Sequence, residues 1–479
     1  MLFPLVAGQN AEAGCIVPDM KRRELLGYSG AAIISGAAAA KATPGSGAAA
    51  AKSGIVPPDL SFLREGPLVN ADRAREKMDA AGVDAIVALL APNVFHLSGH
   101  WPQADRMGHG NSSLAILPRD PARPLAVIMP GFLHYYVHSD ETPAGDRAVF
   151  TYNSPAMDGA GPGPDGEPAA VPTGVYPILN PDLVSPRETR RRAAAASVRG
   201  VSPGMDWALR RALRELHLDN ARLAYDHPDV AVMIGARGMG ARCVPGGNLL
   251  RRIRMVKSPR EIQLMRIGAQ LNVDAAVAAA KSARSAGTTR ALRARYFSEA
   301  AARGLMPLFM VIDQSSSEVM NAELREGQCF AIDCVSSLRY YHGDFSRSIF
   351  IGEPSSKMQQ VVAMTNRAWS DVRGALRPGL RFSEIQRIGK ESIKRQGGDF
   401  NISFTPHSVG LYHTDMPFQS VAEPQAIEPF VLEEGMVLSV DCPLGHVGVG
   451  GSSHLEDLSL ITREGSEPIH TVPPNVFVV

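Results

Sequence analysis

The chain has 479 residues, and its 49 lysines and arginines nearly balance 48 aspartates and glutamates, giving a formal net charge of +1. With 45% hydrophobic and 20% charged residues, it has the composition of a globular protein large enough for two or three domains. No basic stripe marks a nucleic-acid-binding surface, and five scattered cysteines argue against a disulfide framework or a thiolate zinc site.

The first 55 residues are predicted to be an export segment followed by a linker rich in alanine and glycine. Residues 21–26 (KRRELL) resemble a twin-arginine signal, and a mildly apolar stretch and small residues follow them. We expect Met20 to be the start, and export to the bacterial periplasm; the alternative is an unstructured tail on a cytoplasmic protein. Because no run of about 20 uninterrupted apolar residues occurs, we predict no membrane-spanning helix.

Residues 56–245 are predicted to form an α/β domain, because helical and strand-like stretches alternate. A helix is expected at 71–81, capped by Asn70 and ended by Gly82. Apolar runs predict strands at 83–90, 114–117, 125–129 and 223–225. A loop rich in proline and glycine at 153–182 precedes one long arginine-rich helix, expected at 189–216.

Residues 246–479 are predicted to form an α+β domain. Ser258 and Glu261 form a capping box with Pro259 at the first helical position, which predicts a helix from residue 259. Two further helices are expected at 357–376 and 382–396. Short apolar runs predict strands at 329–335, 340–351, 436–442 and 455–461.

Acidic side chains lie within these apolar strands, where a charge is costly unless it is paired or bound to a metal. Asp333 lies inside one strand and Asp344 follows a turn at 336–339, so a hairpin would place both carboxylates side by side. Two close carboxylates need a cation or a shared proton. Asp441 ends a third apolar strand, Glu456 enters a fourth, and His407 lies in a loop between them.

Four carboxylates match the charge of two divalent metal ions, and His407 adds an imidazole nitrogen. Mixed oxygen and imidazole ligands suit Mn, Co, Zn or Fe, and two ions close together would activate a water molecule. Taken alone, each acid is equally compatible with a structural salt bridge, and His407 with a surface histidine. Cys334 and Cys442 each follow a proposed ligand on a strand, so their side chains should face away from the ions.

These residues resemble the creatinase / Xaa-Pro peptidase family, whose catalytic domain has the pita-bread fold. The motifs that carry the resemblance are Asp333, 344–347 (DFSR), 407–410 (HSVG), 435–441 (GMVLSVD) and 456–457 (ED). Weaker similarities at 82–85, 93–99 and 256–262 extend it over about residues 60–475. The resemblance implies a creatinase-like N-terminal domain at 56–245, a pita-bread catalytic domain at 246–479, and a homodimer or higher homo-oligomer.

Four departures from the family pattern bear on the chemistry. Asp441 stands where the family has a glutamate, and the histidine usual before the first aspartate strand is missing. The later catalytic histidine of the family falls on Thr414, which lies between His413 and Asp415. The arginine two positions before the last glutamate is replaced by His454. We therefore predict catalytic roles, as acid, base or oxyanion donor, for His413, His454 and Asp415; the alternative for the histidines is a solvated loop position.

The leading prediction is a dinuclear metallohydrolase that resembles Xaa-Pro dipeptidases and aminopeptidases, in which metal-bound hydroxide attacks a peptide or amide bond. A second reading keeps the fold but changes the reaction, to an amidinohydrolase, a ring-amide hydrolase or a lyase acting on dimethylsulfoniopropionate; the altered histidines favour it. A third is a non-catalytic module that binds a partner, which the five competent ligand residues disfavour. The expected substrate is a small peptide or amide-like molecule.

Overall fold

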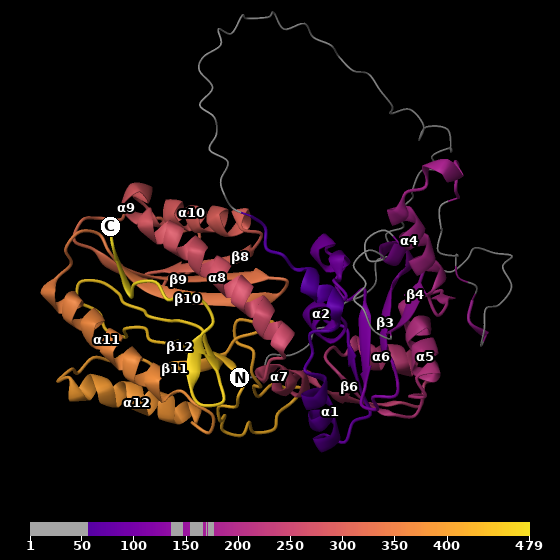
Figure 1. Ribbon diagram of the computed structural model, residues 1–479. Helices are drawn as coiled ribbons and strands as arrows, with labels where there is room; N and C mark the ends of the chain where they lie inside the picture. Colours follow the sequence, from indigo (N-terminus) through magenta and orange to yellow (C-terminus); the bar gives the residue numbers. More distant parts are fainter. Residues whose placement is uncertain (1–55, 136–146, 154–165, 169, 171–176) are drawn as a thin grey trace, which may run out of the picture. The chain divides into compact units, whose positions relative to one another are not determined.

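The computed structural model describes residues 56–135, 147–153, 166–168, 170 and 177–479 (Figure 1). The predicted export segment and linker at 1–55 lie outside the described residues, as does most of the loop rich in proline and glycine. In the described part of the chain, no helix is both long enough and apolar enough to cross a membrane. The α/β domain followed by an α+β domain, as predicted, is confirmed.

The N-terminal domain is built on a seven-stranded sheet in the order β5-β4-β3-β2-β1-β6-β7, in which only β2 runs antiparallel to its neighbours. The strands are β1 (Ala85–Ala88), β2 (Leu114–Pro118), β3 (Leu125–Pro130), β4 (Arg147–Tyr152), β5 (Val201–Ser202), β6 (Arg222–Tyr225) and β7 (Arg242–Pro245). The helices are α1 (Ala71–Ala80), α2 (Ala91–Ser98), α3 (Gly131–Leu133), α4 (Pro186–Ala196), α5 (Met205–Glu215) and α6 (Asp229–Ala236).

Helices cover both faces of this sheet, which explains why β1 is apolar throughout. Ala85 and Val87 pack in one cluster with residues of α5 and α6. Ile86 and Ala88 pack in the other, with residues of α1 and α2. Because successive side chains of a strand point to opposite faces, a strand covered on both sides shows no polar alternation. The predicted boundary at residues 245–246 stays a prediction, although β7 ends at Pro245.

The end signals predicted for the first helix are present in α1. The side chain of Asn70 accepts a hydrogen bond from the backbone nitrogen of Arg73, and Gly82 follows the helix with a φ of +61°. The long helix predicted at 189–216 is wrong. Two helices, α4 and α5, stand there with the edge strand β5 between them. Pro203 and Gly204 interrupt the helical pattern, because proline disfavours helical geometry in the residue before it.

The C-terminal domain holds two four-stranded sheets, in the orders β15-β10-β9-β8 and β11-β12-β13-β14. The strands are β8 (Met306–Ile312), β9 (Cys329–Leu338), β10 (Tyr341–Phe350), β11 (Thr405–Ser408), β12 (Val437–Asp441), β13 (Ser459–Ile461), β14 (Ser466–Pro468) and β15 (Val476–Val478). The helices are α7 (Gly247–Met255), α8 (Pro259–Lys281), α9 (Ala283–Ala286), α10 (Thr289–Ala302), α11 (Ser356–Ala375) and α12 (Phe382–Arg395).

Each sheet of this domain has its own pair of helices. Helices α8 and α10 pack on β8, β9 and β10, whereas α11 packs on α12, and α12 contacts β11 (Figure 1). The helices predicted at 357–376 and 382–396 are confirmed as α11 and α12, and the capping box at Ser258 begins α8. Cys334 and Cys442 lie in the two separate hydrophobic cores, as expected for small buried side chains.

Helix α8 lies directly against β10 because Gly343 has no side chain. A Cβ atom at Gly343 would sit 2.6 Å from the Cβ of Asn272 on α8. Asn272 is fully buried, and its amide nitrogen donates to the carbonyl oxygen of Cys334 at 2.9 Å. Its amide oxygen accepts from the hydroxyls of Tyr296 and Ser336, each at 2.6 Å. One amide therefore joins α8 and α10 to the hairpin that carries the first two carboxylates.

We expect Gly343→Ala to destabilise the protein by about 1–3 kcal/mol, because the added methyl group would force α8 away from the sheet. The matched control is Gly374→Ala in α11, where an added Cβ meets no atom within 4 Å. There alanine should be neutral or stabilising by about 0.5–1 kcal/mol, because it favours the helix. Urea unfolding followed by circular dichroism measures both, and equal effects at the two sites would contradict this packing.

Candidate metal centre

The first two carboxylates come from the β9–β10 hairpin. Its turn residues, Arg339 and Tyr340, have positive φ angles of 49° and 69°, as two-residue hairpin turns require. Asp344 pairs with Val335 and therefore lies diagonally opposite Asp333 on the same face of the sheet. The predicted hairpin is confirmed, although β9 runs three residues further than expected, β10 is one residue shorter at each end, and the turn lies at Arg339 and Tyr340, later than 336–339.

The other three predicted ligands come from the sheet β11-β12-β13-β14 and from the extended segment that precedes β13. His407 on β11 pairs with Ser439 on β12, and Asp441 ends that strand on the same face. Glu456 lies just before β13 and forms an isolated antiparallel bridge with Ser346 on β10. The hydroxyl of Ser439 donates a hydrogen bond to the Glu456 carboxylate. The two sheets thus bring their polar faces together.

The ring of His407 lies among three carboxylates. Its Nε2 atom is 3.6 Å from Asp344 Oδ2, 3.4 Å from Asp441 Oδ2 and 3.6 Å from Glu456 Oε1. These separations exceed ordinary hydrogen bonds. They are close to the spacing of two ligands on one ion, since donors about 2.1 Å from a metal lie roughly 3.0–3.4 Å apart.

Several buried polar atoms of this cluster have no hydrogen-bond partner among the described residues. They include Asp333 Oδ1, Asp344 Oδ1, His407 Nδ1 and Nε2, His454 Nε2 and Glu456 Oε2. Buried polar atoms without a partner lower the stability of the folded state unless an ion or a water molecule binds between them. The donor atoms gather in three groups, each within 4.8 Å: Asp344, His407 and His413; Asp333, His454 and Glu456; His407, Asp441 and Glu456. Shared members make this one continuous centre, and its donors fit divalent metal ions.

The acidic groups cannot all ionise easily in the metal-free protein. Burial, reinforced by the charge of Asp344, raises the pKa of Asp333 to about 7. The same two causes raise the pKa of Glu456 well above its ordinary value. Burial also opposes ionisation of Asp441, but the neighbouring histidines hold its pKa below the ordinary value. The cluster therefore favours the binding of positive charge.

His413 lies at this centre, whereas motif matching had placed Thr414 at the position of the catalytic histidine. Its Nε2 atom is 3.1 Å from Asp344 Oδ2, and its ring centroid is 4.9 Å from that of His407. Phe309 on β8 meets the His413 ring edge to face at 5.6 Å. Burial lowers the pKa of His413, but the contact with Asp344 outweighs it and raises the pKa to about 9. One third of the side chain remains exposed, so His413 is open to a small molecule.

His454 also lies at the centre. Its Nε2 atom is 3.5 Å from Asp441 Oδ1 and 3.9 Å from Glu456 Oε2. Only 13% of its side chain is exposed. Two of the three residues predicted to be catalytic are therefore beside the predicted metal ligands.

Asp415 lies in a different environment, a buried ion pair with Arg254 of α7. Arg254 Nη2 donates to Asp415 Oδ1 at 2.6 Å, and the backbone nitrogen of Leu411 donates to Oδ2 at 3.1 Å. Arg254 also donates to Asn93 of α2, whose amide nitrogen donates to Asp226 after β6. A chain of buried and partly buried polar contacts thus runs from the N-terminal domain to the loop that holds His413. For Asp415 we propose a positioning role in that loop.

Arg347 fixes the segment of Glu456. The residue belongs to the motif at 344–347, but the motif alone does not show this role. Arg347 is fully buried, and its Nη2 atom lies 2.6 Å from Asp457 Oδ1. Its Nη1 atom donates to the carbonyl oxygen of Glu456 at 2.7 Å. Sequence reasoning also missed Ser439 and Phe309. Both look like ordinary strand residues until the sheet register is known.

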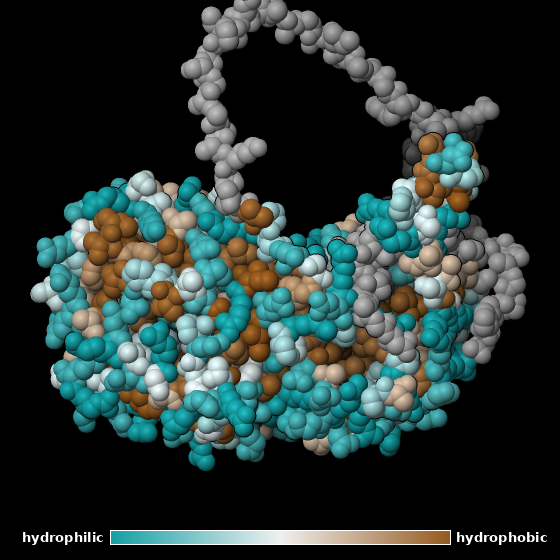
Figure 2. All heavy atoms as spheres, in the orientation of Figure 1, coloured by the Kyte–Doolittle hydropathy of each residue, from teal (hydrophilic) through white to brown (hydrophobic). Residues whose placement is uncertain are grey.

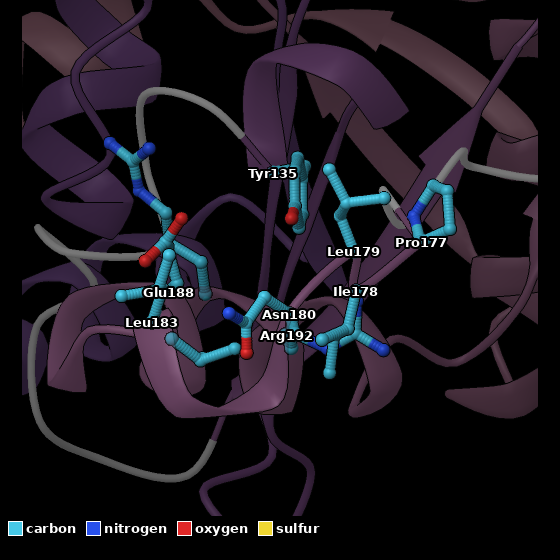
Figure 3. Close-up of a pocket in the computed structure, with 10 residues that line it drawn as sticks. Tyr135, Pro177, Ile178, Leu179, Asn180, Leu183, Glu188 and Arg192 are labelled. Atoms are coloured by element: carbon cyan, nitrogen blue, oxygen red, sulfur yellow. The ribbon is translucent and has the colours of Figure 1, made fainter.

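A separate pocket of about 430 Å³ lies on the N-terminal domain (Figure 3). None of the possible metal-binding groups within the described residues includes one of its side chains. Hydrophilic and hydrophobic residues alternate over the face shown in Figure 2, without one dominant patch. The pocket is lined by Tyr135, Pro177, Ile178, Leu179, Asn180, Leu183, Val184, Glu188, Arg191 and Arg192.

Comparison with known families matches residues 263–463 to metallopeptidase family M24. A probable dipeptidase, PepE, of Mycobacterium tuberculosis is 28% identical over 254 residues, which cover 51% of this chain and 66% of the relative. An Xaa-Pro dipeptidase of Pyrococcus furiosus is 25% identical over 229 residues, covering 46% of this chain and 64% of the relative. The chain thus matches slightly less than two thirds of these relatives' length.

Solved structures show the same two-domain fold over more of the chain. A prolidase from Pyrococcus horikoshii superposes with a TM-score of 0.57 at 18% identity, covering 84% of this chain and 98% of that one. An X-Pro aminopeptidase from Thermotoga maritima gives a TM-score of 0.58 at 15% identity, covering 86% and 99%. The expected creatinase-like and pita-bread architecture is confirmed.

We expect the metal-free protein to lose stability as the pH rises. Unfolded aspartate and glutamate have pKa values of about 4. A folded-state value of about 7 means that Asp333 contributes stability below pH 4, which is lost as the pH rises through 7. Glu456 is shifted in the same direction. The melting temperature of chelated protein should therefore fall between about pH 4 and 7, and excess divalent metal should reverse the fall.

The matched variant is Asp333→Asn, which removes one titrating group and keeps its size. Its chelated form should show a shallower fall of melting temperature with pH. The two forms should be compared by scanning calorimetry in identical buffers. A melting temperature that rises with pH in the chelated wild-type protein would contradict the assignment.

Proposed function

We propose that the protein is a metal-dependent peptidase acting on dipeptides or Xaa-Pro peptides, because residues 263–463 match metallopeptidase family M24. The observation that carries the proposal is the convergence of unpaired, buried donor atoms on three overlapping groups, which are linked through His407 and Glu456. We assign two divalent ions to Asp333, Asp344, His407, Asp441 and Glu456. When bound, such ions supply Lewis acidity for a substrate carbonyl and lower the pKa of a water molecule.

The protein's own residues would bind and protonate the substrate. His413 is a partly exposed histidine of the cluster, and its Nε2 atom lies 3.1 Å from Asp344 Oδ2, which holds its ring. A protonated ring there can donate to a carbonyl oxygen or to a leaving nitrogen. Phe309 offers an apolar edge beside it, suited to a ring such as that of proline. Arg254 and Asp415 keep the loop of His413 in place.

We expect hydrolysis of Xaa-Pro dipeptides by protein loaded with Mn(II), Co(II), Zn(II) or Fe(II), and none after chelation. Release of free proline measures it, with reversal of the order of residues, Pro-Xaa, as the substrate control. Absence of turnover with every metal would contradict the peptidase assignment. Elemental analysis of the purified protein would identify the native ions and their number.

His413→Gln should lower kcat by about 100-fold or more, because glutamine cannot transfer a proton. Metal content should be unchanged, since we assign His413 to the substrate and not to an ion. The control is His109→Gln, which replaces an exposed histidine outside the cluster. Loss of a metal ion together with activity would instead identify His413 as a ligand.

A second candidate function rests on the altered residues around the ions. The histidine usual before the first aspartate strand of the family is missing, and His454 stands where the family pattern has an arginine. These changes would suit an amide other than a peptide, or dimethylsulfoniopropionate, better than an extended peptide. Release of dimethyl sulfide from that compound, or hydrolysis of amidino or ring amides without Xaa-Pro cleavage, would favour this function.

Export and assembly complete the proposal. The resemblance of residues 21–26 to a twin-arginine signal supports export to the periplasm, a route that carries proteins already folded with their metal ions. The family resemblance supports a homodimer. Fractionation of cells after changing both arginines, Arg22 and Arg23, to lysine tests the first point, and light scattering tests the second.

A further inference from the structure

The side chains of His454 and Glu456 point to the same face of one extended segment. Gly451 bridges to Cys329 of β9, and Glu456 bridges to Ser346 of β10, so the residues between them run beside the sheet. Side chains two positions apart on extended backbone point to the same face. His454 therefore faces the same cluster as Glu456.

The imidazole nitrogen of His454 has no hydrogen-bond partner there. Nε2 is shielded from solvent and unpaired within the described residues. It belongs to the donor group formed with Asp333 and Glu456, whose atoms lie within 4.8 Å of one another. That group contains no other nitrogen. The distance to Asp441 Oδ1, 3.5 Å, is again longer than a hydrogen bond and close to the spacing of two ligands.

We infer that His454 is a metal ligand, which gives the ion held by Asp333 and Glu456 a nitrogen donor of its own. This inference rests on the proposed metal centre and goes beyond it, since it replaces an acid–base role by coordination. The other ion already has the nitrogen of His407. Each of the two ions would then have one imidazole ligand, so the donor sets of the two ions would be similar.

Charge supports this assignment. The family pattern has an arginine at this position, which would place a fixed positive charge beside two divalent ions and cannot coordinate. A histidine carries no such fixed charge and adds a nitrogen donor. Asp441, the shortened acid, lies 3.5 Å from His454 Nε2, nearer than Glu456 at 3.9 Å. The two departures from the family pattern are thus in contact and can be understood as one change.

The consequence is a different metal preference. Ions bound only by carboxylates favour Mn(II) or Mg(II), whereas an added imidazole favours Fe(II), Co(II) and Zn(II). We expect this protein to bind two Co(II) or Zn(II) ions with similar strength. In His454→Gln one of the two binding steps should weaken by about 10-fold or more, and the other should remain.

The test uses the full-length protein loaded with Co(II). In proton NMR, each imidazole bound to Co(II) gives a strongly shifted ring N–H signal that exchanges with solvent. His454→Gln should lose one such signal, and His109→Gln should lose none. Titration calorimetry in parallel measures both binding steps. The same number of shifted signals and unchanged binding in His454→Gln would overturn the inference.

A second variant, His454→Arg, separates coordination from hydrogen bonding. Arginine can still donate to Asp441 but cannot bind an ion. If His454 only orients Asp441, this variant should retain both binding steps, and that result would also overturn the inference. If His454 is a ligand, the variant should behave as His454→Gln or worse. Circular dichroism of the metal-free variants verifies folding, and two bound ions without peptide hydrolysis would refute the proposed reaction alone.

Discussion

Mutual repulsion among buried carboxylates is the constraint around which the C-terminal domain is arranged. Asp344 and Glu456 are buried and Asp333 is partly buried, and apolar strands carry the two aspartates. Like charges at this depth cannot coexist without a proton, a histidine or a cation. His407 and His413 satisfy part of this need. The remaining unpaired oxygens leave a need that divalent ions can meet.

The surrounding structure holds these groups against their repulsion. The hairpin is anchored to two helices through Asn272. Arg347 fixes the backbone of Glu456 and pairs with Asp457, so its own charge is neutralised locally. Removing either partner of such a buried pair leaves an uncompensated charge. Rigidity here keeps the donors apart at distances suited to ions and too long for hydrogen bonds.

Much of the fold and most of the cluster could be predicted because local chemistry determines them. An acid inside an apolar strand, such as Asp333, and a capping box at Ser258 are readable without tertiary information. The break in the region 189–216 was not predicted, because strong helix formers on both sides of Pro203 and Gly204 indicated one continuous helix. Edge strand β5 is only two residues long and has no periodicity to detect.

The histidines show where sequence reasoning ends. Whether His413 or Thr414 reaches the cluster depends on the path of the loop, which the buried pair of Asp415 with Arg254 determines. No residue count along the chain contains that information. Asp415 itself resembled a catalytic acid because it stands next to that loop position. Its partner is distant in sequence, and only the assembled domains bring them together.

The order of the ligands along the chain has a consequence for biosynthesis. Asp333 and Asp344 leave the ribosome first, and Glu456 leaves it last, followed by β15, which pairs with β10. A nascent chain therefore carries repelling carboxylates before the groups that complete the centre exist. Metal capture must then be a late step, after the two sheets have met. Any chaperone or export machinery that acts earlier would receive a chain without its ions.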